Sequence, residues 1–306
     1  MKVDILMATY NGGSYLKNQL LSLQMQTHQN WRLLVRDDGS TDETLSILKD
    51  FSNADDRICI IDHDSGKKLG AGSNFLGLTQ FVDSDYIIFC DQDDIWFEKK
   101  LEFLIENAKE NFIYDKPCLV YCDGYGYSDS LGVITNNSIS RLHAENLRDF
   151  IFFNAGYQGC SILFNKNLCS YVSKYRADFH LHDDIVSLVA HTFGKVFFVN
   201  KKLMLYRQHG LNVTGNIEYS ITKKIKKFVF DRGFVISARH FLEKKQFYDF
   251  YYDILSDTNK KTFEYYFSFP NLNLFKRFFL IFSKKFTFGG SLFYLLCKTA
   301  FQRPIE

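Results

Sequence analysis

Residues 86–96 read Tyr86-Ile87-Ile88-Phe89-Cys90-Asp91-Gln92-Asp93-Asp94-Ile95-Trp96, an apolar run that ends in three carboxylates. A continuous run of bulky apolar residues is typical of a strand buried on both faces, as in a parallel sheet covered by helices. The acids then lie at the carboxyl end of that strand. Because ligands of open α/β sheets bind in the crevice beyond those ends, we expect a charged substrate there.

Asp91 and Asp93 stand two residues apart, so their side chains share one face if the chain stays extended, whereas Asp94 points elsewhere. Two convergent carboxylates favour Mg²⁺ or Mn²⁺, whose remaining positions would be filled by water and by the phosphate oxygens of a nucleotide diphosphate. The acids could instead only cap the helix predicted at 99–110. A cap needs one Asp, and three acids after a buried strand favour the metal site.

The chain before this stretch alternates strand-like apolar runs with helical periodicity. Strands are predicted at 3–8, 31–36 and 58–61, and a helix is predicted after each of them. Four strands alternating with helices over about ninety residues predict a parallel, doubly wound sheet. A tight turn follows the first strand at 9–13, and acids follow the second at Asp37 and Asp38. These strand ends indicate a nucleotide pocket.

The pattern is less regular beyond residue 110. It predicts a strand at 118–123, a glycine-rich loop leading into an apolar run at 156–164, a helix at 185–193, and strand-like runs at 195–199 and 203–210. The last run closes the first domain.

The composition limits the class of protein. With 306 residues, 46% of them hydrophobic, the chain can form one large domain or one domain and an appendage. Residues 216–306 hold 16 Lys and Arg against 8 Asp and Glu, whereas residues 1–215 hold 21 against 27, and the net charge of +2 predicts no bulk affinity for nucleic acid. Seven cysteines, partly inside apolar runs, indicate reduced thiols of a cytosolic protein. We expect neither a signal peptide nor a membrane span.

Five motifs occur in order along the chain. They are Ala8-Thr9-Tyr10-Asn11-Gly12, Arg36-Asp37-Asp38-Gly39-Ser40-Thr41-Asp42, Asp91-Gln92-Asp93-Asp94-Ile95-Trp96, His182-Asp183 and Tyr206-Arg207-Gln208-His209. With them the chain resembles family 2 glycosyltransferases of the GT-A type, most closely the bacterial rhamnosyltransferase-like enzymes, over roughly residues 2–215. The resemblance implies an α/β fold of GT-A type, a Rossmann-like and mostly parallel sheet flanked by helices. It places a nucleotide-sugar-binding catalytic domain at 1–215 and a helical C-terminal region at 216–306.

The resemblance assigns the turn after the first strand and Asp38 to the nucleotide. Tyr10 would stack on the base, with Thr9 and Asn11 beside it, and Asp38 would accept a hydrogen bond from the pyrimidine N3. Without the family, Tyr10 is a partly exposed turn aromatic, and Asp38 could cap the next helix, although Asp42 is better placed for that.

The Asp-x-Asp motif receives the cation by the same resemblance. Asp91 would lie nearer the ribose, Asp93 would be the more direct ligand of Mn²⁺ or Mg²⁺, and Asp94 would hold the loop. Arg207 and His209 stand two apart, so both could reach the diphosphate from one side, and the histidine would complete the metal shell. A histidine in a loop can also be simply solvated.

Sugar transfer with inversion needs a base that takes the proton from the attacking acceptor hydroxyl. The resemblance assigns this role to Asp183, although this chain has His182 where many relatives carry Glu. If the match to the family motif is shifted by one residue, Asp184 is the base instead. Without the family, both acids could simply begin the helix at 185–193. The turn at Gly159 and Cys160 would form part of the acceptor wall.

The C-terminal region alternates basic and apolar residues at roughly helical spacing, first at 221–230 and again at 275–286. Such helices can lie in the headgroup region of an anionic membrane. We therefore expect a peripheral protein on the inner face of the cell membrane, with a lipid-linked acceptor. The alternative is a helical subdomain that packs on the catalytic core or against the partner of a homodimer.

The predicted activity is inverting transfer of a sugar from a dTDP- or UDP-sugar, with rhamnose from dTDP-rhamnose as the first hypothesis, to a cell-surface polysaccharide precursor such as a capsule repeat. Two rivals remain at this stage. A sugar-1-phosphate nucleotidyltransferase shares the sheet and the paired acids, but its glycine-rich opening loop is absent here. An inactive nucleotide-sugar-binding or scaffolding subunit would not need Asp91, Asp93 and Asp183 intact.

Overall fold

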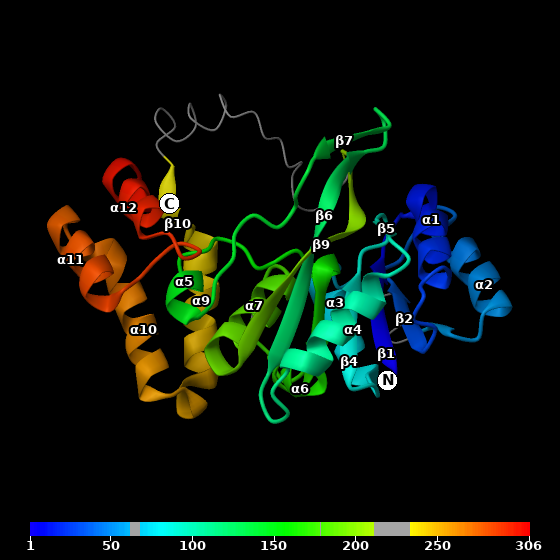
Figure 1. Ribbon diagram of the computed structural model, residues 1–306, viewed down its shortest axis with the longest axis horizontal. Helices are drawn as coiled ribbons and strands as arrows, with labels where there is room; N and C mark the ends of the chain where they lie inside the picture. The colour runs from blue at the N-terminus through cyan, green and yellow to red at the C-terminus, as the bar shows by residue number, and fades with distance from the viewer. Residues whose placement is uncertain (62–67, 178, 211–232) are drawn as a thin grey trace.

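The computed structural model describes residues 1–61, 68–177, 179–210 and 233–306, so the helix expected near 221–230 lies outside the described residues. The central element is a nine-stranded mixed sheet in the order β3-β2-β1-β4-β8-β6-β9-β5, with β7 paired to β6 (Figure 1). The predicted α/β class is thereby confirmed. The strands are β1 (Val3–Thr9), β2 (Trp31–Asp37), β3 (Ile58–Ile60), β4 (Tyr86–Cys90), β5 (Ile95–Trp96), β6 (Cys118–Ser128), β7 (Val133–Asn136), β8 (Ile162–Asn165) and β9 (Lys195–Gln208).

Helices cover both faces of this sheet. They are α1 (Gly13–Gln24), α2 (Thr44–Ala54), α3 (Ala71–Leu78), α4 (Lys100–Asn111), α5 (Leu147–Phe150), α6 (Lys166–Val172) and α7 (His182–Phe193). In β4 the side chains alternate between two apolar cores, Ile87 and Phe89 in one and Ile88 and Cys90 in the other. The strand is therefore buried on both faces, as its sequence predicts.

The register of the parallel strands brings the predicted site residues to one edge. Strands β3, β2, β1 and β4 run parallel, and within the ladder Thr9 faces Asp37 while Met7 faces Cys90. Because these strands end side by side, the turn after β1 and the acids after β2 and β4 meet at the same edge of the sheet.

The second half of the sheet departs from the predicted pattern. Strand β8 runs antiparallel to β4 and β6, and β9 is one continuous strand along β6 where the sequence predicts two separate runs. The short strand β5 pairs antiparallel with the end of β9, with Ile95 facing Leu205. This pairing places the end of β9 beside the acidic stretch after β4.

The C-terminal region packs on the catalytic core. It contains β10 (Phe234–Ile236), α9 (Ala238–Tyr251), α10 (Asp257–Ser268), α11 (Leu274–Lys284), α12 (Leu292–Phe301) and β11 (Arg303–Ile305), and β10 pairs with β11. The Phe152 ring meets Tyr266, Phe269 and Phe286 edge to face at 5.1–5.4 Å. The helices stand at the opposite end of the molecule from α1 and α2 (Figure 1), and their buried residues join the core that includes Phe89. Packing of this region on the core is therefore observed, and a membrane contact of its exposed face stays a prediction.

In the described part of the chain, every helix is too short or too polar to cross a membrane.

Candidate active site

A cavity of about 580 Å³ opens at the carboxyl ends of β1, β2 and β4. Of the predicted site residues, it is lined by Thr9, Tyr10, Asn11, Asp38, Asp91, Asp93, Asp183 and His209. Arg207 is the exception, because its buried side chain does not line the cavity. Acids from separate turns therefore meet around one space large enough for a nucleotide sugar.

The turn after β1 is held from two sides. Asn11 adopts a left-handed conformation with φ of 47°, and its side-chain Oδ1 accepts a hydrogen bond from the Thr41 N–H at 2.9 Å. The Gln92 amide accepts from the Tyr10 N–H and donates to the Tyr10 carbonyl, both at 3.0 Å. A Cβ on Gly12 would overlap the amide of Gln92, so a larger residue there would displace the side chain that holds Tyr10. The Tyr10 ring stays 48% exposed, with the Lys68 ammonium 4.6 Å from its centre, and can stack on a base.

Asp38 is a buried carboxylate with fixed neighbours. It accepts hydrogen bonds from the N–H groups of Leu69 at 2.7 Å and Gly70 at 2.8 Å and from the Arg36 guanidinium at 2.9 Å. Burial alone would raise the pKa of Asp38, but these three donors hold it below the usual value. The side chain is therefore ionised and positioned as an acceptor at the cavity wall.

The three acids after β4 fall into two groups, as their spacing predicts. Asp91 and Asp93 line the cavity, whereas Asp94 is fully buried and accepts the Arg207 N–H at 3.1 Å, which ties the acidic loop to β9. His209 Nε2 lies 2.7 Å from Asp93 Oδ2, and the His209 ring stacks on Tyr15 at 4.5 Å. Asp93 and His209 are thus in direct contact, and their joint binding of a metal stays a prediction.

Arg207 supports the acidic loop. Its Nε donates to the Asp93 carbonyl at 2.7 Å, its guanidinium pairs with Asp129, and Tyr15 lies 4.9 Å from the guanidinium carbon. In this arrangement Arg207 positions Asp93 from behind the cavity wall, and its contact with the donor phosphates stays a prediction.

Asp91 and Asp93 fit a divalent cation. Burial, and then repulsion by Asp93, raises the pKa of Asp91 to about 7, which means that the pair has too little positive charge around it. The ligand atoms of Asp91, Asp94 and Cys160 also lie within 4.8 Å of one another. However, burial raises the pKa of the Cys160 thiol, and the charges of Asp94 and Asp91 add to this, so the thiol stays protonated. Since Mn²⁺ and Mg²⁺ prefer oxygen ligands, Asp91 and Asp93 form the better pair.

Lys100 is a functional residue that the sequence analysis did not identify. Its ammonium is fully buried, donates to the Cys160 carbonyl at 2.7 Å and lies 3.8 Å from the centre of the Trp96 ring. It lowers the pKa values of Asp91 and Asp94 and so offsets part of their charge. A signal was present in the sequence, because Lys100 shares the helical phase of the apolar residues Leu104 and Ala108.

The predicted base lies in the first turn of α7, which begins three residues earlier than the sequence predicts. Asp183 lines the cavity together with Gln158 and Gly159, whereas Asp184 does not. Burial raises the pKa of Asp183 well above its usual value, and the charges of Asp184 and Asp91 add to this. A raised pKa makes its carboxylate a stronger base. The geometry therefore favours Asp183 over the neighbouring acid.

Asp184 points toward α9 instead. It accepts the Gly156 N–H, and its other oxygen lies 3.5 Å from His240 Nε2. Burial would raise its pKa, but the bond from His240 and the nearby Lys244 charge lower it. Two adjacent aspartates thus have opposite environments.

His182 fills a buried position in the wall of the cavity. Its ring stacks on Phe75 at 4.0 Å and meets Phe89 edge to face at 4.4 Å, and neither ring nitrogen has a hydrogen-bond partner within the described ranges. A Cβ on Gly159 would stand 2.6 Å from His182 Nε2, so the loop requires glycine there. Burial lowers the pKa of His182 to about 3.

We expect His182 to make folding stability sensitive to acid. In the unfolded chain this histidine binds a proton below its pKa of about 6.5, whereas in the folded protein it stays neutral down to about pH 3. Between these values the unfolded state binds more protons, so the free energy of unfolding falls as the pH falls. This group contributes a slope of about 1.4 kcal/mol per pH unit in that window. Urea unfolding of His182→Leu from pH 6.5 to 4 should show a slope shallower by that amount. An unchanged slope would contradict the buried neutral ring, and the partly exposed His28→Leu serves as the control.

Comparison with known proteins decides the family. The model of "Glycosyl transferase family 2" matches residues 4–167. A dTDP-rhamnosyl transferase, RfbG of Shigella flexneri, is 32% identical over 234 residues, which cover 71% of this chain and 77% of that protein. The chain belongs to glycosyl transferase family 2. It is therefore a transferase of glycosyl groups, of class EC 2.4, and the rival assignment to nucleotidyltransferases does not hold.

The chain is also similar to other glycosyltransferases, in sequence and in structure. The β-1,3-glucosyltransferase WfgD of Escherichia coli, which acts on an α-D-GlcNAc-diphosphoundecaprenol acceptor, is 36% identical over 111 residues, 36% of this chain and 42% of that protein. Among solved structures, residues 1–349 of S. aureus TarS with UDP-GlcNAc align with a TM-score of 0.59 at 14% identity over 92% of this chain and 73% of that chain. A mannosyltransferase of Pyrobaculum calidifontis with GDP-Man and Mn²⁺ aligns with a TM-score of 0.54 at 11% identity, over 98% and 84%. These structural likenesses confirm the GT-A fold.

Proposed function

We propose that this glycosyltransferase moves a sugar, with inversion, from a nucleoside diphosphate donor to a hydroxyl of a cell-surface polysaccharide precursor. The observation that carries the proposal is that Asp183 lines the same cavity as Asp38, Asp91 and Asp93. A base, a nucleotide pocket and a cation site are the three parts that this reaction needs. The first donor to test is dTDP-rhamnose, because RfbG is a dTDP-rhamnosyl transferase.

In the proposed reaction the side chains of this cavity bind the donor and move one proton. Tyr10 stacks on the base and Asp38 accepts a hydrogen bond from it. The acceptor hydroxyl gives its proton to Asp183 while its oxygen attacks the anomeric carbon from the face opposite the leaving nucleoside diphosphate. Mn²⁺ or Mg²⁺ held by Asp91 and Asp93, with His209 beside them, would neutralise charge on the diphosphate. The buried Arg207 holds the Asp93 carbonyl, and the charge of the buried Lys100 lowers the pKa of Asp91.

The test is a transfer assay with the full chain. Purified protein, Mn²⁺ and an undecaprenyl diphosphate-linked sugar are mixed in turn with dTDP-rhamnose, UDP-glucose and UDP-GlcNAc, and the nucleotide released and the glycan formed are measured. We expect turnover with dTDP-rhamnose and a product whose anomeric configuration is opposite to that of the donor. Binding of donors without any turnover would instead support an inactive binding subunit, and retention of configuration would reject Asp183 as a simple base.

We further propose that α11 and α12 lie on the inner face of an anionic membrane, which would bring the cavity to a lipid-linked acceptor. Phe275, Phe279 and Phe282 stand at i, i+4 and i+7 on α11 and are 84%, 74% and 58% exposed. Lys276 and Lys285 are exposed on the same helix and its C-cap. Apolar burial together with attraction to anionic headgroups favours such a surface.

Replacing the three α11 phenylalanines with serine should lower binding to vesicles at least about 10-fold, because each buried Phe contributes roughly 1.5–3 kcal/mol. Co-sedimentation with phosphatidylglycerol vesicles measures this, and Leu242→Ser, a 59% exposed apolar residue on α9, is the matched control. Substitution is preferable to removal of residues 216–306, since that region shares the core with the catalytic domain. Unchanged vesicle binding together with loss of a dimer in size-exclusion chromatography would assign the surface to a homodimer instead.

A further inference from the structure

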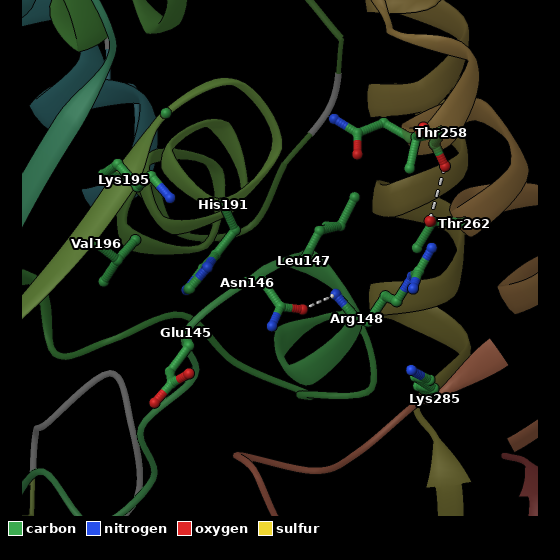
Figure 2. A pocket seen from close by; sticks show the side chains of 12 residues that line it. Glu145, Asn146, Leu147, Arg148, His191, Lys195, Val196, Thr258, Thr262 and Lys285 are labelled. Atoms are coloured by element: carbon green, nitrogen blue, oxygen red, sulfur yellow. Dashed lines mark hydrogen bonds between the residues drawn. The ribbon is translucent and has the colours of Figure 1, made fainter. Parts of the chain in front are cut away.

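A second cavity, of about 510 Å³, lies at the C-terminal end of α7 (Figure 2). Asp183 lies in the first turn of the same helix, at its other end. The second cavity is formed where the end of α7 and the start of β9 meet the start of α5, the first turns of α10 and the residue after α11. It shares no lining residue with the first cavity. The reaction proposed above uses none of its side chains.

Unpaired positive charge surrounds this second cavity. Arg148, Lys195 and Lys285 line it, and none of them forms an ion pair with another residue in the described part of the chain. Among the described residues that line it, Glu145 is the only acid. The lining therefore has a net charge of about +2, which favours an anionic ligand.

A buried histidine adds a neutral donor. The Tyr157 hydroxyl accepts the Ala144 N–H at 3.2 Å and lies within hydrogen-bond distance of His191 Nε2, at 2.9 Å. The second ring nitrogen, Nδ1, has no hydrogen-bond partner among the described residues. His191 lines the cavity, is 8% exposed and stacks on Phe150 at 4.4 Å. Burial lowers its pKa to about 3, so the ring stays a neutral N–H donor.

The remaining lining groups suit a sugar better than a nucleotide. The Asn146 side chain is already used, because it accepts from the Arg148 N–H and donates to Asp149. The Thr258 hydroxyl stays available for ligand hydroxyls, and Leu147 and Val196 offer apolar contacts. Apart from the His191 ring, this lining contains no aromatic side chain on which a base could stack.

We propose that this second cavity binds an anionic saccharide, a sugar that carries a phosphate or a carboxylate. Arg148, Lys195 and Lys285 bind the anionic group, while the His191 ring and Thr258 bind hydroxyls. The proposal does not depend on the transfer reaction, because binding is measured directly.

Isothermal titration calorimetry of the full chain with glucose 1-phosphate, glucuronate, uncharged glucose and inorganic phosphate tests the proposal. We expect saturable binding of glucose 1-phosphate or glucuronate, the two anionic forms, and at least 10-fold weaker binding of glucose. The double variant Arg148→Ala/Lys195→Ala should raise the Kd at least 10-fold. The double variant Lys49→Ala/Lys109→Ala removes the same charge at exposed positions elsewhere and should not change it.

Three outcomes would overturn the proposal. Equal effects of the two double variants would show nonspecific attraction by the net charge, and glucose binding as tightly as its phosphate would remove the role of the cations. Inorganic phosphate binding as tightly as both saccharides would indicate an adventitious ion only. Thermal unfolding of each variant checks that the fold is retained, which we expect because Lys195 is exposed and Arg148 partly exposed.

Discussion

Asp183→Asn should lower kcat for sugar transfer by about 10²–10⁴-fold, the range that positioned general bases contribute. The amide keeps the shape of the side chain but cannot take the proton of the acceptor hydroxyl. Donor binding should be retained, because Asp183 is assigned to the acceptor and not to the nucleotide. Single-turnover transfer gives the rate, and calorimetry with dTDP gives the donor Kd.

The same substitution should leave the protein at least as stable as the wild type. Since burial and two neighbouring acids raise the pKa of Asp183, its charged form is disfavoured in the folded state. Removing the charge should raise the free energy of unfolding by about 1 kcal/mol, as when a site strained for function is relaxed. A kcat within 10-fold of wild type would contradict the assignment. If the substitution lowers the free energy of unfolding together with kcat, Asp183 has a structural role only.

The sequence allowed the edge of the sheet to be predicted because the information there is local. An apolar run followed by acids indicates a buried strand that ends in a site, and a spacing of two residues places Asp91 and Asp93 on one side. The cavity is lined by both, together with Asp38 from the end of β2, which is separated from β4 by β1. These predictions needed only the strand period and the rule for parallel sheets.

The contacts that hold the site depend on long-range pairing and were not predicted. Gln92 fixes Tyr10 across the register of β1 and β4, and Arg207, a predicted site residue, reaches Asp93 only because β9 pairs with β5. Nothing within their own segments indicates these contacts. The C-terminal region was incompletely predicted for a related reason, because basic, Phe-rich periodicity is the same for a helix on a membrane and for one on a core. Its inner residues pack while Phe275 and Phe279 stay exposed.

Asp184→Ala should destabilise the fold by about 3 kcal/mol, the low end of the cost of removing one partner from a buried ion pair. The substitution leaves the Gly156 N–H without its acceptor and His240 without its acid. It also removes negative charge near Lys244, which is only 5% exposed. We expect the loss of unfolding free energy at the low end of that range, because the negative charge of Glu243 still acts on Lys244. The free energy of unfolding in urea measures the effect, and Asp249→Ala, at an exposed position of α9, should change it by less than about 0.5 kcal/mol.

A double-mutant cycle with Lys244→Met then tests whether charge causes this loss. If the two charges stabilise each other, Asp184→Ala/Lys244→Met should be more stable than the sum of the single losses predicts. Lys245→Met, the exposed neighbour, should show no such coupling. Because burial raises the pKa of Asp183 while His240 and Lys244 lower that of Asp184, the two adjacent aspartates should respond in opposite ways. Asp183 is expected to control the rate and Asp184 the stability, and the reverse pattern would make Asp184 the base.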